Sequence, residues 1–312
     1  MKPKSIILTI FVMLIGACSK DDKINDESLR VAVRFNSQIS VQQTRTTGGG
    51  DKWVEEDDHV GIYMVKHEEP ETIVDAAVNV QYKATEVNAD NAANAVFSPA
   101  NTAQTIFFPQ DGKKVNFVAY YPYKSGIEEE YAYPVNVGDQ ENQTAIDLLY
   151  ATANNGGAGY NKTAGPVKLT FEHKLSKLAI KVERGAGIDP NSEVEVTIKK
   201  MNRTAEFDLR TGNLIYIEEP ATTDITPYYN TASETYEAIL LPVTSIGDEQ
   251  YVEFEVEGDT YRWQIKNNIP SLEAGKKYAY TIAISRAGLR GTKCAITEWI
   301  STIEDDDALE HK

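Results

Sequence analysis

The chain has 312 residues, of which 41% are hydrophobic and 25% charged, a composition typical of a protein with packed cores and long enough for two domains. Its formal net charge of −16 argues against nucleic acid and anionic lipid surfaces as partners, because both attract lysine and arginine. Only two cysteines are present, Cys18 and Cys294, so we expect stability to come from packing rather than from disulfides.

The N-terminus has the features of an export signal. Lys2 and Lys4 precede a hydrophobic run that is shorter than the roughly 20 residues of a membrane-spanning helix. The run ends in Ile15-Gly16-Ala17-Cys18, which resembles the bacterial lipoprotein box, where cleavage before the cysteine is followed by lipidation of its thiol. We expect a signal peptide at 1–17, acyl chains such as palmitate on Cys18, and an acidic tether at 18–28. The alternative is an ordinary signal peptide with a chance cysteine.

Hydrophobic and polar residues alternate along most of the chain, which indicates half-buried β-strands. The first strand is expected at Leu29, Val31, Val33 and Phe35, and others within 115–119, 194–199 and 278–284. The glycine-rich sequence at 154–159, together with Gly165-Pro166, marks the best domain boundary. We therefore expect an all-β protein with two β-sandwiches, at residues 29–165 and 166–312.

One hairpin can be predicted pair by pair. A two-residue loop at Gly258-Asp259 would pair Phe254 with Trp263 on one face and Glu255 with Arg262 on the other. One face of the hairpin is then hydrophobic and the other carries opposite charges, so Trp263, on the hydrophobic face, is interpreted as a core residue.

Residues that could carry catalysis or bind metal are scattered. The four histidines lack metal-ligand spacing, and neither a nucleophile elbow nor a phosphate-binding loop is present. His173 lies on the hydrophobic face of its predicted strand, which favours a core histidine. The tyrosines at 120, 121, 123, 131 and 133 could form a carbohydrate platform, but rings packed at strand ends are the favoured interpretation. We predict no enzymatic activity, no cofactor and no metal site.

Six segments, in order, resemble the fimbrillins of Bacteroidales. They are Trp53 with residues 57–64, then 108–123, 147–151, 171–178 (Phe-Glu-His-Lys-Leu-Ser-Lys-Leu), Leu241-Pro242 and 272–278. The resemblance covers residues 29 to about 300, and it departs from the usual pattern at Asp57-Asp58, where Gly-Asp is common. Ser19-Lys20-Asp21-Asp22 is similar to the surface-export tag of lipoproteins in the same group.

The resemblance implies two transthyretin-like, Greek-key β-sandwiches and a role as a shaft or tip subunit of type V fimbriae. Such a subunit reaches the outer membrane and cell surface as a lipoprotein precursor and supports adhesion. An Arg-specific protease then removes its first strand, and a strand from another fimbrial subunit fills the opened groove by donor-strand exchange. Surface ligands on host or bacterial cells are further expected partners.

Three sets of residues fit that mechanism. We predict cleavage between Arg45 and Thr46, within a polar, glycine-rich stretch of the kind that proteases enter. The displaced strand would carry Leu29, Val31, Val33 and Phe35. The donor strand is assigned to the segment with Cys294, Ile296, Trp299 and Ile300, although its pattern breaks strict alternation.

Two alternatives stay open. A non-polymerising fimbrial anchor would keep its lipid and remain uncut at Arg45. A lipid-anchored, glycan-binding surface protein would need an exposed aromatic platform, for which Trp53 and Trp299 are the candidates. The sequence does not distinguish shaft, tip and anchor, and it identifies neither the protease nor an adhesive ligand.

Overall fold

The fold is described for most of the chain. A computed structural model describes residues 30–40, 52–70, 72–74, 77–127, 131–216 and 222–298, with residue 222 and residues 290–298 described by their backbone alone. The chain divides into two units, residues 1–30 and 31–312, and all the described residues except Arg30 lie in the second. Within this described part, no helix is long and hydrophobic enough to cross a membrane.

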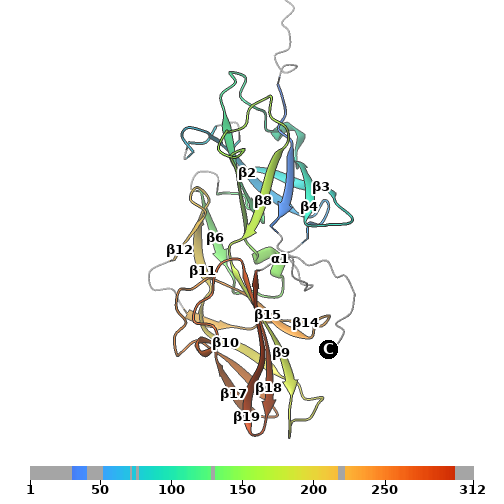
Figure 1. The fold of residues 1–312 in the computed structure, drawn as a ribbon, viewed down its shortest axis with the longest axis vertical. Coiled ribbons are helices and arrows are strands. Elements are labelled where there is room, and N and C mark those ends of the chain that lie inside the picture. Colours follow the sequence, from blue (N-terminus) through green and yellow to red (C-terminus); the bar gives the residue numbers. More distant parts are fainter. Residues whose placement is uncertain are drawn as a thin grey trace, which may run out of the picture. The chain divides into compact units, whose positions relative to one another are not determined.

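Seven strands form a closed β-barrel (Figure 1). Their order around the barrel is β1 (Phe35–Ile39), β4 (Asn94–Pro99), β3 (Val80–Val87), β2 (His59–Lys66), β5 (Val115–Tyr121), β7 (Leu149–Ala153) and β8 (Val167–His173). Neighbours are antiparallel except at the closure, where β1 runs parallel to β8. The all-β prediction is confirmed, but these strands close into one barrel instead of forming the two separate sheets of a sandwich.

The barrel also extends past the predicted domain boundary. Strand β8 follows Gly165-Pro166 in sequence, yet it pairs with β1 and with β7. A boundary at residue 165 would separate β8 from the sheet that it closes. The glycine-rich stretch at 154–159 therefore connects two strands of one sheet, and its composition reflects tight turns.

Three smaller sheets complete the structure. The three-stranded sheet contains β12 (Asn213–Ile215), β11 (Thr204–Asp208) and β6 (Ala132–Asn136). The four-stranded sheet contains β13 (Thr222–Ile225), β10 (Glu195–Asn202), β16 (Tyr251–Val256) and β17 (Asp259–Gln264). The five-stranded sheet contains β14 (Tyr228–Asn230), β15 (Thr235–Leu240), β9 (Ser176–Arg184), β18 (Lys276–Ser285) and β19 (Gly288–Glu298). The short helices are η2 (Thr102–Gln104), α1 (Gln143–Ile146) and η3 (Ile265–Asn267).

Two hydrophobic cores follow from this arrangement, and strands β2 and β5 contribute to both. Met64 and Phe117 point into the barrel core, whereas Tyr63 and Val118 belong to the core shared with the other sheets. Burial on both faces explains why these strands read as nearly continuous hydrophobic runs rather than strict alternations.

The predicted hairpin exists, but its register differs by two residues. The loop is Glu257-Gly258, and Phe254 pairs with Tyr261 instead of Trp263. Both loop residues have positive φ, 52° and 82°, as a type I′ turn requires. A two-residue shift preserves which face each side chain occupies, so Trp263 is buried as predicted, at 7% exposure.

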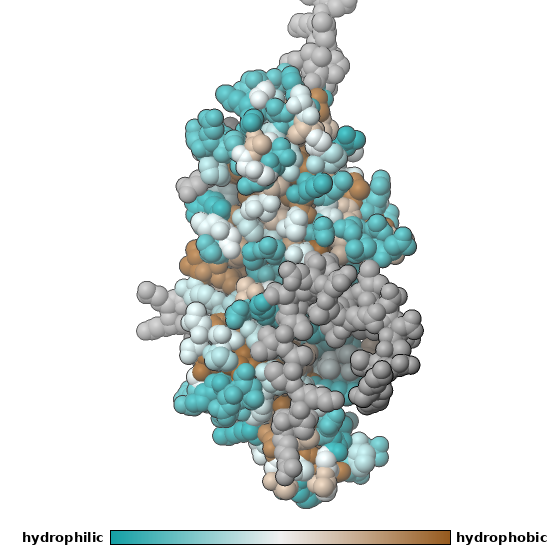
Figure 2. Space-filling model, viewed as in Figure 1, coloured by the Kyte–Doolittle hydropathy of each residue, from teal (hydrophilic) through white to brown (hydrophobic). Residues whose placement is uncertain are grey.

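The surface agrees with the acidic, polar composition. On the face drawn in Figure 2, the described surface is mostly hydrophilic, with hydrophobic residues in small separate patches. The large hydrophobic residues found exposed in the described part are Val31, Val54, Ile215, Tyr216 and Tyr229.

Candidate strand-exchange site

Strand β1 is held by backbone hydrogen bonds on both edges. It pairs antiparallel with β4, Phe35 opposite Phe97, and parallel with β8, Phe35 opposite Val167 (Figure 1, blue strand between β4 and β8). At its end the Ile39 amide donates to the Ala93 carbonyl at 2.9 Å, and the Ser40 amide donates to the Phe171 carbonyl at 2.6 Å. Removing β1 would leave a strand-shaped gap with unpaired backbone groups on both sides.

The inward face of β1 supplies a row of buried side chains. Phe35 and Ile39 are fully buried, and Ser37 between them is 5% exposed. The Phe35 ring meets Tyr82 and Phe117 edge to face, with centroids 5.1 and 5.2 Å apart. The Ser37 hydroxyl donates to the Ala95 carbonyl at 3.1 Å. Each position on this face thus has its own environment, which is what strand recognition by alternate pockets requires.

The segment before β1 is more loosely attached than predicted. Val33 is buried and its amide donates to the Ile106 carbonyl at 2.9 Å, but Val31 is 41% exposed. Regular pairing begins only at Phe35, where the predicted strand was expected to end. Leu29 lies outside the described residues. Among the described residues, the buried row of this segment is therefore Val33, Phe35, Ser37 and Ile39, and Val31 lies outside it.

Tyr82 supports both β1 and the preceding segment. Its ring packs on Phe35, and its hydroxyl accepts a hydrogen bond of 2.9 Å from the Ile106 amide, whose carbonyl in turn holds Val33. Burial raises the pKa of Tyr82 to about 12, so this hydroxyl stays neutral at physiological pH.

Loss of β1 would be energetically severe. Full burial of a Val, Ile or Phe side chain contributes about 1.5–3 kcal/mol. Val33, Phe35 and Ile39 together therefore contribute on the order of 5–9 kcal/mol, comparable with the roughly 5–15 kcal/mol that stabilises a whole domain. A subunit that lost β1 would need another strand in its place.

The predicted modification sites lie outside the described residues. These are the lipidation site Cys18 and the cleavage residues Arg45 and Thr46, the latter two within the 41–51 segment that links β1 to Lys52. The described chain resumes beside Trp53, which is 3% exposed and meets Phe97 and Phe171 edge to face. A buried Trp53 cannot serve as a sugar-stacking platform, so that candidate of the glycan-binding alternative is wrong. Trp299 lies outside the described residues.

The predicted donor residues fall in two groups. Cys294 and Ile296 belong to β19, which pairs antiparallel with β18 along its whole length, opposite Tyr280 and Tyr278. Trp299 and Ile300 come after the last described residue, Glu298.

Three tyrosines of the predicted cluster are packed, as expected, and the other two, Tyr123 and Tyr131, are half-buried. Tyr120, Tyr121 and Tyr133 are at most 8% exposed, and burial raises the pKa of each phenol. The hydroxyls of Tyr120 and Tyr121 donate to Asn79 Oδ1 and Asp58 Oδ1, at 2.7 and 2.9 Å. These hydroxyls make protein contacts instead of pointing into solvent.

His173 has the core position that was predicted for it. It is 4% exposed, and its Nδ1 lies 3.0 Å from Oδ1 of the fully buried Asp147. Among the described residues, no group of three or more His, Cys, Asp or Glu side chains could hold a metal ion.

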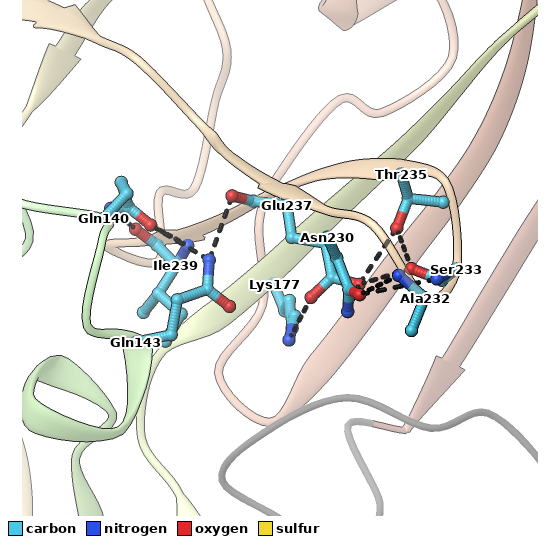
Figure 3. Close-up of polar contacts among 9 residues, drawn as sticks. All are labelled: Gln140, Gln143, Lys177, Asn230, Ala232, Ser233, Thr235, Glu237 and Ile239. Carbon is cyan, nitrogen blue, oxygen red and sulfur yellow. Dashed lines mark hydrogen bonds and ion pairs between the residues drawn. The ribbon is translucent and has the colours of Figure 1, made fainter.

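A buried polar cluster covers the outer edge of β15 (Figure 3). Gln140 binds both backbone groups of Ile239: its amide nitrogen donates to the carbonyl at 2.9 Å, and its oxygen accepts from the amide at 2.8 Å. Gln143 donates to the Glu237 carbonyl at 2.9 Å. We call these two residues the β15 edge cap, because they occupy hydrogen-bonding groups that an added strand would use.

A buried ion pair lies beside the edge cap. Lys177 Nζ is 2.7 Å from Glu237 Oε2, with both side chains at most 3% exposed. Burial raises the pKa of Glu237, but the charges of Lys177 and Lys277 and the hydrogen bonds from Lys177 and Thr235 outweigh that effect and hold it below its usual value. Sequence reasoning missed the ion pair, because polar residues within strands, such as Lys177 and Glu237, are ordinarily assigned to solvent. It missed the edge cap because Gln140 and Gln143 lie between β6 and β7, where no strand pattern links them to β15.

Comparisons with known proteins place the chain in a family. The fimbrillin-like family model matches residues 44–299. Fim1C of Bacteroides uniformis, a candidate fimbrium subunit, is 30% identical over 310 residues, with 96% of each chain covered. The crystal structure of a candidate cell adhesion protein from Bacteroides uniformis is 28% identical, with a TM-score of 0.71 over 86% of this chain and 98% of that one. A candidate cell adhesion protein from Bacteroides ovatus has the same fold, with 21% identity and a TM-score of 0.67 over 88% of this chain and 99% of that one. The chain therefore belongs to the fimbrillin-like family.

Proposed function

We propose that this chain is a shaft or tip subunit of cell-surface fimbriae, assembled with other fimbrial subunits by donor-strand exchange. It is a structural and adhesive component rather than an enzyme. The precursor is lipidated at Cys18, reaches the outer membrane, and is cut between Arg45 and Thr46 by an Arg-specific protease. Cleavage there also separates the mature subunit from its lipid anchor.

The observation that carries this proposal is the position of β1. The strand that closes the barrel ends at Ile39, on the N-terminal side of the proposed cleavage site. A cut after Arg45 therefore severs β1 from the other six strands of the barrel without breaking any of them. The resulting acceptor site would offer free backbone groups of β4 and β8 and a hydrophobic floor that contains Tyr82 and Phe117.

The test is to express the full precursor in a Bacteroidales host and determine the N-terminus of the surface material. We expect a new N-terminus at Thr46 and a ladder of polymers on a gel of unboiled sample. Arg45→Ala should abolish both, whereas Arg34→Ala, at an exposed arginine just before β1, should leave both unchanged. An intact, lipidated Cys18 with monomer only would refute the proposal and favour the anchor.

A further inference from the structure

We propose that a pocket at one end of the barrel binds a sugar unit of a cell-surface glycan. Strand β2 begins at His59, β5 ends at Tyr121 and β7 begins at Leu149. Because these strands are antiparallel neighbours, the three ends meet at the same end of the barrel, where α1 also lies (Figure 1). The pocket there has a volume of about 480 Å³ and opens to solvent. We call it the barrel-end pocket; its lining comes from 52–59 and 121–123, with Gln81, Thr144, Ala145 and Leu149.

The barrel-end pocket is separate from the strand-exchange site. None of its described lining residues belongs to β1. Sugar binding therefore needs neither removal nor replacement of that strand. The inference rests on the surface location and adhesive role proposed above, and it names the ligand class for that role.

One part of the lining is hydrophobic. Val54, one of the large hydrophobic residues on the described surface, is 51% exposed and lies at this pocket. Pro122 and Tyr123 are half-buried and add to the same lining, and the buried Leu149 lies among them. The C–H face of a sugar ring can pack on such a surface, with Tyr123 as the aromatic contact.

The polar part of the lining is held in place by hydrogen bonds. Gln81 Nε2 donates to His59 Nδ1 at 2.7 Å, and His59 Nε2 then donates to the Glu56 carbonyl at 3.2 Å. The imidazole is therefore neutral, with its proton on Nε2, and the carbonyl oxygen of Gln81 is left to accept from a ligand. Side chains that are already ordered lose little entropy when a ligand binds.

Two neighbouring carboxylates supply further acceptors. Asp58 Oδ2 accepts from the Val54 amide at 2.6 Å, and Oδ1 accepts from the Tyr121 hydroxyl at 2.9 Å. Burial raises the pKa of Asp58 by more than these hydrogen bonds lower it, and the charge of the exposed Asp57 raises it further. A ligand hydroxyl that donates here would favour the charged carboxylate, and hydrogen bonds to charged groups are the stronger class.

The charges of the lining select the class of ligand. Lys52 faces two carboxylates, Asp57 and Asp58, so a phosphate or sulfate group would be repelled more than attracted. A wholly hydrophobic ligand would bury these carboxylates without giving them a donor. A sugar ring has C–H groups on its face and hydroxyls along its edge, so it satisfies both parts of the lining. The volume is also within the roughly 300–1,000 Å³ that small-molecule sites have.

Filling the pocket tests the site without disturbing a core. Ala145 is exposed on α1 and lines the pocket, so Ala145→Trp should occupy the space of the sugar. The matched control is Ala103→Trp on η2. Ala103 is also exposed, and the amide of each alanine donates to Oδ1 of the asparagine that caps its helix.

The probe is a printed array of defined oligosaccharides that carry hexoses, N-acetylhexosamines and sialic acids. The purified precursor lacking its signal peptide is applied to the array, and the sugar that binds best is then titrated calorimetrically. We expect Ala145→Trp to weaken binding by about tenfold or more and Ala103→Trp to leave it within about twofold. Asp57→Asn should also weaken it by about tenfold, whereas Asp90→Asn, at an exposed aspartate outside the pocket, should not. Circular dichroism checks that every variant is folded.

The site and the strand exchange fail in different ways. A precursor that binds no sugar on the array, or that binds equally well with Ala145→Trp, would overturn the barrel-end pocket even if fimbriae form normally. An uncut, monomeric precursor that still binds the sugar would refute strand exchange and leave this site standing, because binding is measured on the uncleaved chain.

Discussion

Replacing Phe35 by alanine in the uncleaved precursor should destabilise the barrel by about 3–5 kcal/mol. Phe35 is fully buried and its ring meets two other aromatic rings. Truncation removes roughly 100–150 Å² of buried hydrophobic area, or about 2.5–4 kcal/mol at 25 cal/mol per Å², and leaves a cavity that adds to the loss. The barrel cannot readily collapse into that cavity, since its strands are hydrogen-bonded all the way round.

The assay is guanidinium unfolding of the precursor lacking its signal peptide, followed by far-UV circular dichroism. With a slope of about 4 kcal/mol per M, the unfolding midpoint should fall by about 1 M. The matched control is Asn36→Ala, on the exposed face of the same strand, which should change stability by less than about 0.5 kcal/mol. A loss below about 1 kcal/mol for Phe35→Ala would show that β1 does not hold the barrel closed.

Three further predictions concern the rest of the fold. The charge of Lys177 lowers the pKa of Glu237, so the ion pair stabilises the protein above pH 4.5, the usual pKa of glutamate. This stability is lost as the pH falls through the lower pKa of the folded protein, so Glu237→Gln should flatten the dependence of the melting temperature on pH below 4.5. Gln140→Ala should lower the free energy of unfolding by about 2–3 kcal/mol in denaturant titrations, because both backbone groups of Ile239 lose their hydrogen-bond partner. Gln143→Ala should lower it less, because only the Glu237 carbonyl loses its partner. Gly258→Ala should cost about 1–2 kcal/mol by backbone strain alone, since φ is 82° and open space surrounds the position, and Gly258→Asn should cost less.

Local patterns predicted the strand content well, because alternation reports directly on which face is buried. The alternation identified Val33 and Phe35 as buried positions. Ile39 completes the same buried row but was not predicted, because the polar Ser37 interrupts the hydrophobic pattern before it. Closure of the barrel depends on β1 pairing with β8, more than 120 residues away, and no local pattern encodes such a partner.

The hairpin shows how a tertiary contact can decide a turn. The loop was expected one residue later, at Gly258-Asp259, and glutamate, which occupies its first position in the structure, rarely adopts positive φ. In the structure, Glu257 Oε1 accepts hydrogen bonds from the Asp189 amide at 2.8 Å and the Ser192 hydroxyl at 2.6 Å, and Oε2 accepts from Arg286 at 2.9 Å. These partners, distant in sequence, hold Glu257 in the conformation that its own preference disfavours.

The β15 edge cap bears on how many partners one subunit can have. Strand β14 covers β15 from Thr235 to Glu237, and Gln140 and Gln143 occupy its backbone as far as Ile239. A side-chain amide that satisfies a strand edge prevents another chain from adding there. Under the strand exchange proposed above, β15 would therefore add no second acceptor beside the one at β1, and assembly of subunits through one acceptor and one donor each gives an unbranched filament.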